Sequence, residues 1–168
     1  MYYLDLYLFN FINGFAKKFK ALDFFAKLFA VWIGPVLFLI LALIAFSYKS
    51  LEIFIFPLCS AFVSRFIICE AIYFFYKRKR PVEVLTVNQL IKKPNHPSFP
   101  SGHSAAFFAL SFALLPYSLF WALVFLILST ILVFFRIFCG VHWPSDILAG
   151  VVSGFLSFVI VFFIKIYV

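Results

Sequence analysis

The chain has 168 residues, of which 66% are hydrophobic and 12% charged, and its net charge at pH 7 is +8. A soluble domain has roughly 45–50% apolar and about 25% charged residues, so this composition excludes a soluble fold and predicts an integral membrane protein. The length suits a single domain over residues 1–168, with no separate soluble module. The basic residues form no nucleic-acid-binding module, and we expect anionic lipid head groups rather than nucleic acid as their partners.

The segments in chain order predict an all-α membrane bundle. Residues 1–20 are apolar with near-helical spacing and end in lysines, which indicates an amphipathic helix lying in the membrane interface, with a buried half-span as the alternative. Five apolar segments then predict transmembrane helices at 24–47, 52–76, 102–116, 118–138 and 145–166. A span needs about 20 residues, so the third is short. The one substantial hydrophilic stretch is 77–101.

An odd number of spans brings four helix ends to one face of the membrane. The end of span two, the start of span three, the end of span four and the start of span five all meet there. The polar residues concentrate at these four points. We therefore expect the following side chains to converge although they are far apart in sequence: Arg80, Ser101, His103, Arg136, His142 and Asp146.

Part of this set is suited to binding a phosphoryl group. Ser101 is a good helix N-cap, and Gly102 lets a ligand approach the backbone closely. The free N–H groups at a helix start form an anion site. Arg80 and Arg136 add guanidinium groups, which bind phosphate through charge-assisted and often bidentate hydrogen bonds.

The histidines add chemistry to this binding site. A neutral imidazole of His142 can attack phosphorus, and Asp146, four residues later, can bond its other ring nitrogen. His103 can protonate the leaving oxygen and then activate water. Taken singly, a histidine at a helix start is typical of a structural hydrogen-bonder, and basic residues beside a span are typical of lipid contacts. The chain has only three histidines, however, and two fall in this patch.

A metal site is the sharper alternative, because His103, His142 and Asp146 are all potential ligands. Arg80 and Arg136 would repel a cation bound there. Anion binding explains the whole set, whereas a metal explains half of it, so we expect no metal and no other cofactor. A non-enzymatic scaffold or transporter that holds anionic lipid is a further alternative, but it gives no role to the two histidines and the aspartate.

The motifs resemble those of the type 2 phosphatidic acid phosphatase (PAP2) family, the membrane lipid phosphatases that share their site with vanadium haloperoxidases. The family's three motifs are K-x6-R-P, P-S-G-H and S-R-x5-H-x3-D. The second is intact at 100–103, and the third is matched by Arg136, His142 and Asp146. The resemblance covers nearly the whole chain and includes the bacterial members that act on lipid A 1-phosphate or on undecaprenyl diphosphate.

Two positions depart from the family pattern. Tyr73 stands where the first motif has its lysine, and Phe135 replaces the serine of the third. The first change removes a phosphate-binding cation. Lys77 is the predicted substitute, because it would lie on one helical face with Tyr73 and Arg80, and Arg78 is the second candidate. Two ionisable residues inside span two are also unusual: Glu70 is expected to support this basic cluster, and Arg65 has no evident partner.

The resemblance implies a role for each matching residue. His142 would be the nucleophile that forms a phosphohistidine, Asp146 its partner, and His103 the general acid and base. The phosphate would be bound by Arg80, Ser101, Gly102, Arg136 and Lys77. The family needs no metal. A separate G-x-x-x-G pattern, Gly150 and Gly154, predicts close packing of span five within the monomer.

Membrane orientation and substrate complete the expectations. Eleven of the fourteen basic residues lie on the predicted catalytic face, which alone would place that face in the cytoplasm. Several of them are assigned to phosphate, however, and bacterial relatives imply the inner membrane with the site facing the periplasm. The substrate is expected to be lipid A 1-phosphate, because the basic 77–93 segment suits a bulky anionic head group. Undecaprenyl diphosphate and then phosphatidylglycerol phosphate are the alternatives.

Overall fold

The computed structural model describes residues 2–167, and its regular elements are all helical. Four helices are long and apolar enough to cross a membrane. They are α2 (Lys20–Ser47), the continuous helix formed by α3 (Glu52–Phe62), η1 (Val63–Ile68) and α4 (Cys69–Phe75), then α7 (Leu119–Phe138) and α8 (Pro144–Tyr167). Their ends agree with four of the predicted spans to within four residues. The predicted all-α membrane bundle is confirmed.

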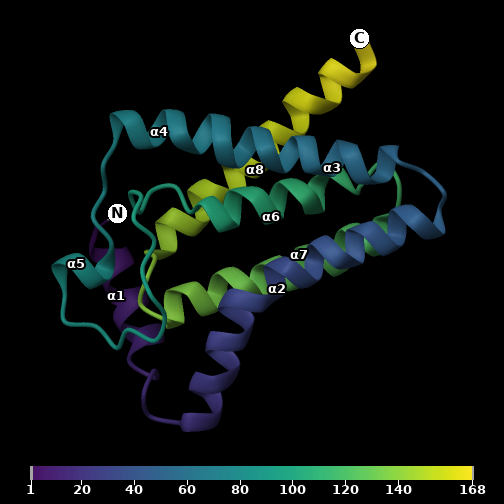
Figure 1. The fold of residues 1–168 in the computed structure, drawn as a ribbon. Helices are drawn as coiled ribbons and strands as arrows, with labels where there is room; N and C mark the ends of the chain where they lie inside the picture. Colours follow the sequence, from purple (N-terminus) through teal and green to yellow (C-terminus); the bar gives the residue numbers. More distant parts are fainter. Residues whose placement is uncertain (1, 168) are drawn as a thin grey trace.

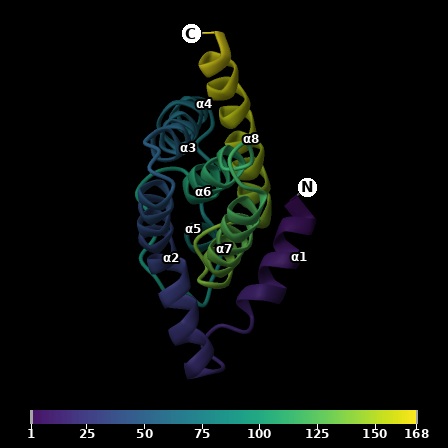
Figure 2. The ribbon, with the colours of Figure 1, turned by 90° about the vertical axis from the view of Figure 1, so that its right-hand side faces the viewer.

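The remaining predicted span, 102–116, is a short helix inside the bundle. Helix α6 (Gly102–Ala113) has 12 residues, which at 1.5 Å per residue reach about 18 Å, well below the about 30 Å of hydrocarbon. It packs against α3, α7 and α8, and Figures 1 and 2 show it in the middle of the molecule. Because neighbouring helices surround α6, it does not need the length of a lipid-facing span.

Helices α6 and α8 approach each other closely because α8 carries glycine at the contact. A Cβ on Gly150 would lie 2.5 Å from Ser104 Cβ, and one on Gly154 would lie 2.8 Å from the Ala105 carbonyl oxygen. Both distances are shorter than real Cβ contacts. The expectation that this glycine pair packs span five within the monomer is therefore confirmed.

The N-terminal helix α1 (Tyr2–Asn13) lies along one end of the bundle, against α7 and α8 (Figure 2). Phe9 is buried and contacts the Trp143 ring at 5.3 Å between centroids, and Asn13 Nδ2 donates to the Phe138 carbonyl at 2.8 Å. Leu4 and Phe11, from the predicted apolar stripe, face outwards. The helix therefore has one face on the protein and an exposed apolar face, as expected for a helix at a membrane interface.

Residues 76–101 form a loop segment that holds only the one-turn helix α5 (Pro81–Val84). We call the end of the bundle that carries this segment the loop end. The prediction that Lys77 and Arg80 continue a helical face of span two is wrong, because α4 ends at Phe75. Four consecutive cations repel one another there, and Pro81 holds Arg80 in an extended conformation at φ −77° and ψ 159°.

Candidate active site

The loop end gathers the predicted site residues from four separate elements. Arg80 precedes α5, Ser101 caps α6, Arg136 lies in the last turn of α7, and His142 and Asp146 flank the start of α8. All five are buried, and none of the five is more than 4% exposed. The direct contacts described below join Arg80, Ser101, His142 and Asp146, as expected for helix ends that converge on one face.

Arg80 fixes the protonation of the His142 ring. Its Nη1 donates to the Val141 carbonyl at 2.7 Å and lies 3.0 Å from His142 Nε2. Because a guanidinium can only donate, Nε2 must be the unprotonated nitrogen. The proton of the neutral ring then sits on Nδ1, which lies 3.3 Å from Asp146 Oδ2. The arrangement directs a lone pair of His142 away from its carboxylate partner.

Burial also keeps the His142 ring neutral. It lowers the pKa of His142 well below its ordinary value, and the positive charges of Arg80 and Arg136 lower this pKa further. At neutral pH the Nε2 lone pair is therefore free of a proton. A neutral imidazole held by a carboxylate on its far side can act as a nucleophile.

Asp146 is held by donors from three parts of the chain. Ser98 Oγ and the backbone N–H of Trp143 donate to Oδ2 at 2.5 and 2.9 Å, and Arg78 Nη1 donates to Oδ1 at 2.7 Å. The carboxylate is thus oriented before any substrate binds. Such orientation sets the ring position of the histidine that Asp146 contacts.

Arg78 links this carboxylate to a second buried acid, Asp5 of α1. Arg78 Nη2 donates to Asp5 Oδ2 at 2.7 Å, and the Ser145 backbone N–H donates to Asp5 Oδ1 at 2.8 Å. Burial alone would raise the pKa of Asp5, but the bonds from Ser145 and Arg78 outweigh it and lower this pKa below its ordinary value. Helix α1 is therefore tied to the start of α8 by the Ser145 hydrogen bond and by Arg78, which bridges Asp5 and Asp146.

Arg136 carries a donor without a partner. Its Nη1 donates to the Ala30 carbonyl at 3.2 Å, whereas its buried Nε has no acceptor among residues 2–167. Buried donors that lack a partner are rare in folded proteins. An anion that reached this guanidinium would supply the missing acceptor, which agrees with the phosphate-binding role predicted for Arg136.

The start of α6 contributes a cap and a histidine. Ser101 Oγ accepts from the Ser104 backbone N–H at 3.4 Å, as predicted for an N-cap, while the Ser101 N–H donates to the Asp146 carbonyl at 2.9 Å. His103 is half-buried and makes no hydrogen bond within the described part of the chain. It lies 6.2 Å from the Phe107 ring, between ring centroids. Both nitrogens of His103 remain available for proton transfer.

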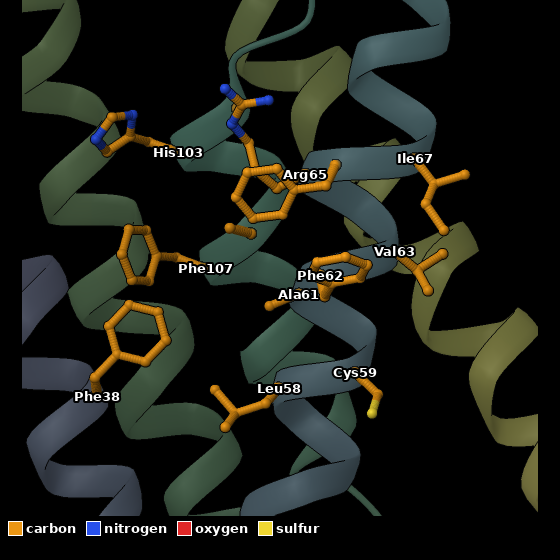
Figure 3. Close-up of a pocket in the computed structure, with 13 residues that line it drawn as sticks. Phe38, Leu58, Cys59, Ala61, Phe62, Val63, Arg65, Ile67, His103 and Phe107 are labelled. Carbon is orange, nitrogen blue, oxygen red and sulfur yellow. The ribbon is translucent and has the colours of Figure 1, made fainter.

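An open pocket of about 740 Å³ leads to this histidine. Figure 3 shows His103 and Arg65 at one end of the pocket and Phe38 and Leu58 towards the other. The rest of its lining is mainly apolar and comes from α3, η1 and α6: Cys59, Ala61, Phe62, Val63, Phe66, Ile67, Gly102, Ala106 and Phe107. The pocket suits a hydrocarbon chain, with polar groups at one end.

The first-motif position is occupied by a buried tyrosine. Tyr73 is 4% exposed, and its hydroxyl donates to the Pro100 carbonyl at 2.8 Å. Lys77 is exposed on the loop, and its proposed binding of phosphate stays a prediction. Arg78 is already paired with two carboxylates. Among residues 2–167, no three His, Cys, Asp or Glu side chains are grouped to hold a metal ion.

The helical bundle and the histidine site define a family of membrane phosphatases. A family model for the PAP2 superfamily matches residues 54–167, and the chain belongs to this family. It is therefore a multi-pass membrane protein and a PAP2 lipid phosphatase.

Two particular relatives match nearly the full length of this chain, and a third matches a shorter part of it. The crystal structure of Aquifex aeolicus LpxE superposes with a TM-score of 0.77 at 29% identity, over 95% of this chain and 94% of that one. The bacitracin transport permease protein BcrC of Bacillus licheniformis is 29% identical over 95% of this chain and 79% of its own length. An undecaprenyl-diphosphatase of Sulfolobus acidocaldarius is 31% identical over 56% of this chain and 47% of its own length.

Sequence reasoning missed three residues that build the site. Asp5, Arg78 and Ser98 orient Asp146 directly or through one another. The sequence presents Arg78 only as a candidate phosphate ligand, and no local pattern distinguishes Ser98. One signal was present for Asp5, because it is the single charged residue in a mainly apolar helix, and a charge in such a place needs a partner.

Proposed function

We propose that this phosphatase acts through a covalent phosphohistidine on His142. Nε2 attacks phosphorus, the bond from phosphorus to the lipid oxygen breaks, and His103 gives that oxygen a proton. His103 then takes a proton from water, which attacks the phosphohistidine and releases inorganic phosphate. Asp146 stabilises the imidazolium through Nδ1. The observation that carries the proposal is the contact of Arg80 Nη1 with His142 Nε2 at 3.0 Å, which directs the lone pair to an anion-binding group.

The phosphate would be held by five groups around that nitrogen. Arg80 would turn Nη1 from the ring to a phosphate oxygen, and Arg136 would use its unpartnered Nε. Ser101 and Gly102 bring the N-terminal end of α6, where backbone N–H groups favour anions. Lys77, exposed on the loop, would attract the charged head group. Phosphoryl transfer needs mainly this kind of positioning and charge stabilisation.

Lipid A 1-phosphate is the substrate we propose first. The exposed cations Lys77, Lys79 and Lys92 surround the loop end and suit a bulky anionic saccharide head group. Undecaprenyl diphosphate is the second candidate, because a relative at 31% identity bears the name undecaprenyl-diphosphatase. Phosphatidylglycerol phosphate is the third.

The test is phosphate release by detergent-purified protein with EDTA present, from these three lipids and phosphatidic acid. We expect wild type to release phosphate from one lipid and to carry an acid-labile phosphoryl group after an alkaline quench. His142→Ala should lose at least about a thousandfold in rate and all of the bound phosphoryl group. Lys165→Ala, far from the site, is the matched control. Full activity of His142→Ala would refute the covalent route, and lipid binding without release would favour a scaffold.

We also propose that the chain lies in a bacterial inner membrane with its loop end in the periplasm. Charge counting alone favours the opposite orientation, but several of the counted cations are assigned to phosphate, and the proposal rests on the periplasmic site that the resemblance to bacterial family members implies. In a variant without native cysteines, Lys79→Cys should react with a membrane-impermeant maleimide applied to spheroplasts. Lys49→Cys, at the other end of the bundle, should not. The reverse pattern would place the site in the cytoplasm.

A further inference from the structure

The first family motif has lost its cation without leaving space for a phosphate. The Tyr73 ring stacks on His96 at 4.9 Å between centroids, and its hydroxyl is used by the Pro100 carbonyl. A phosphate oxygen cannot replace these contacts without unpacking the segment that leads into α6. If the positive charge is still required at this place, it must come from another part of the chain.

Arg65 brings a guanidinium to the same place from the preceding part of the helix. Its guanidinium carbon lies 5.7 Å from the centre of the Tyr73 ring, so the cation sits over the residue that replaced the lysine. The side chain also crosses Gly102, where an added Cβ would lie 2.7 Å from both Cδ and Nε of Arg65. Arg65 therefore adds a positive charge at the N-terminal end of α6, beside the backbone that is proposed to bind phosphate.

The π-helical segment η1 produces this placement. In an α-helix, residues five apart point about 140° away from each other, because each residue turns the chain by about 100°. The wider turn of η1 instead allows Arg65 Nη1 to reach Glu70 Oε1 at 2.6 Å. Single π-helical turns are frequent at functional sites. The expectation that Glu70 supports the Lys77–Arg80 cluster is thereby corrected, because its partner is Arg65.

The Arg65–Glu70 pair is open enough to exchange. The Arg65 side chain is 22% exposed and that of Glu70 is 51% exposed. An ionised residue inside a membrane span is costly and usually serves an ion or a substrate. A half-exposed carboxylate can release the guanidinium to a dianionic phosphate, which offers more charge and more acceptor oxygens than a carboxylate.

The pocket places Arg65 where a lipid phosphate would arrive. Arg65 and His103 lie at the same end of an otherwise apolar pocket (Figure 3), and His103 is the proposed proton donor to the leaving oxygen. A lipid whose hydrocarbon chain enters the apolar part would present its phosphate between these two side chains. The apolar surface that would bind the hydrocarbon chain and the Arg65 guanidinium therefore line one continuous pocket.

On the basis of the proposed phosphatase activity, we infer that Arg65 binds the substrate phosphate in place of the lysine missing at Tyr73. Glu70 holds Arg65 when no phosphate is present. The pocket between α3, η1 and α6 receives a hydrocarbon chain of the same lipid molecule.

Two conservative variants separate this role from a structural ion pair. Arg65→Gln removes the cation, and Glu70→Gln frees it, while both remove the pair. Binding of inorganic orthophosphate to the purified protein, measured by calorimetry, should weaken about 10- to 100-fold in Arg65→Gln, the effect of one charge-assisted bond. It should be unchanged or stronger in Glu70→Gln. KM for the lipid should rise in Arg65→Gln and should be unchanged or lower in Glu70→Gln.

A rescue variant sharpens the assignment. Adding Tyr73→Lys to Arg65→Gln returns a cation to the family position, and we expect it to recover most of the lost orthophosphate affinity. Lys165→Gln, which removes another paired cation from a span, should bind orthophosphate as wild type does.

Three results would overturn the inference. They are equal losses in Arg65→Gln and Glu70→Gln, a full loss in Lys77→Ala with Arg65→Gln unaffected, and no orthophosphate binding by wild type. Because orthophosphate binding needs no turnover, a wild type that binds orthophosphate but releases none from any lipid would refute the proposed function and leave the role of Arg65 to be judged from the variants.

Discussion

The two ends of the bundle both carry ion pairs between distant parts of the chain, but they differ in burial. At the loop end, Arg78 joins Asp5 to Asp146, and these three side chains are 16%, 5% and 0% exposed. At the opposite end, Lys165 pairs with Glu52, and these side chains are 39% and 52% exposed. Exposed ion pairs contribute little to the stability of the fold, whereas breaking a buried pair is strongly destabilising because it leaves a buried charge without a partner. Only the two buried pairs of Arg78 are therefore expected to control the geometry of the site.

The largest effect is expected from changing Asp146, which contacts both His142 and Arg78 at the loop end. Asp146→Asn keeps the shape but can no longer stabilise a charged His142, and its amide also disturbs the bond to Arg78. We expect the rate of phosphate release to fall about 100- to 10,000-fold. Retention of more than about a tenth of wild-type activity would show that Asp146 only positions the start of α8.

A smaller effect is expected from changing Asp5, which reaches Asp146 only through Arg78. Asp5→Asn leaves Arg78 paired with Asp146 alone, so Asp146 should lose orientation, and kcat should fall about three- to tenfold with KM unchanged. The thermal midpoint should fall by about 3–6 °C.

The opposite end offers the matched control for that change. Glu52→Gln removes the carboxylate of the exposed pair with Lys165 and should leave kcat within about twofold of wild type. Equal losses in Asp5→Asn and Glu52→Gln would remove the distinction between the two ends of the bundle.

The smallest effect concerns pH. An unperturbed histidine is half protonated at about pH 6.5, but burial and nearby arginines lower the pKa of His142 well below that value. The ring therefore stays neutral as pH falls from 7 to 6, and protonation of His142 should lower kcat/KM by less than about twofold over this interval.

The same shift links pH to stability. Below about pH 6.5 His142 is protonated in the unfolded chain but stays neutral in the folded protein, so the free energy of unfolding should decrease as pH falls through this range.

The kinetic prediction has its own contrary outcome. A kcat/KM that halves at pH 6.5 would indicate that His142 is solvated in the working enzyme.

The convergence of the site could be predicted because it depends on span parity and motif order. Once five helical segments were recognised, Arg80, His142 and Asp146 had to meet at one end of the bundle. Their contacts at 3.0 and 3.3 Å agree with that prediction. Apolar periodicity and helix-start residues carry this information within a single sequence.

The supporting contacts could not be predicted in the same way. Asp5 reaches Ser145 only because α1 docks on the start of α8, a tertiary contact with no local pattern. Arg65 meets Glu70 because η1 departs from α-helical register, whereas a helical wheel places the two on different faces. The predicted span ends at 76, one residue beyond Phe75, and the error was to continue its helical face to Lys77 and Arg80, which lie in the loop.

The glycine contact between α6 and α8 has a mechanical consequence. With Gly150 packed on Ser104 and Gly154 on the α6 backbone, the two helices that carry His103 and Asp146 behave as one rigid block. Separation of this block would disturb the position of His103 relative to Asp146 and to His142, the residues that we propose carry out catalysis. The apolar pocket is lined by α2, α3, η1 and α6 and by none of the described residues of α8, so a lipid that entered it would displace α2, α3 or η1 rather than α8. Substitutions that stiffen η1 would then slow substrate entry and leave the chemical step intact.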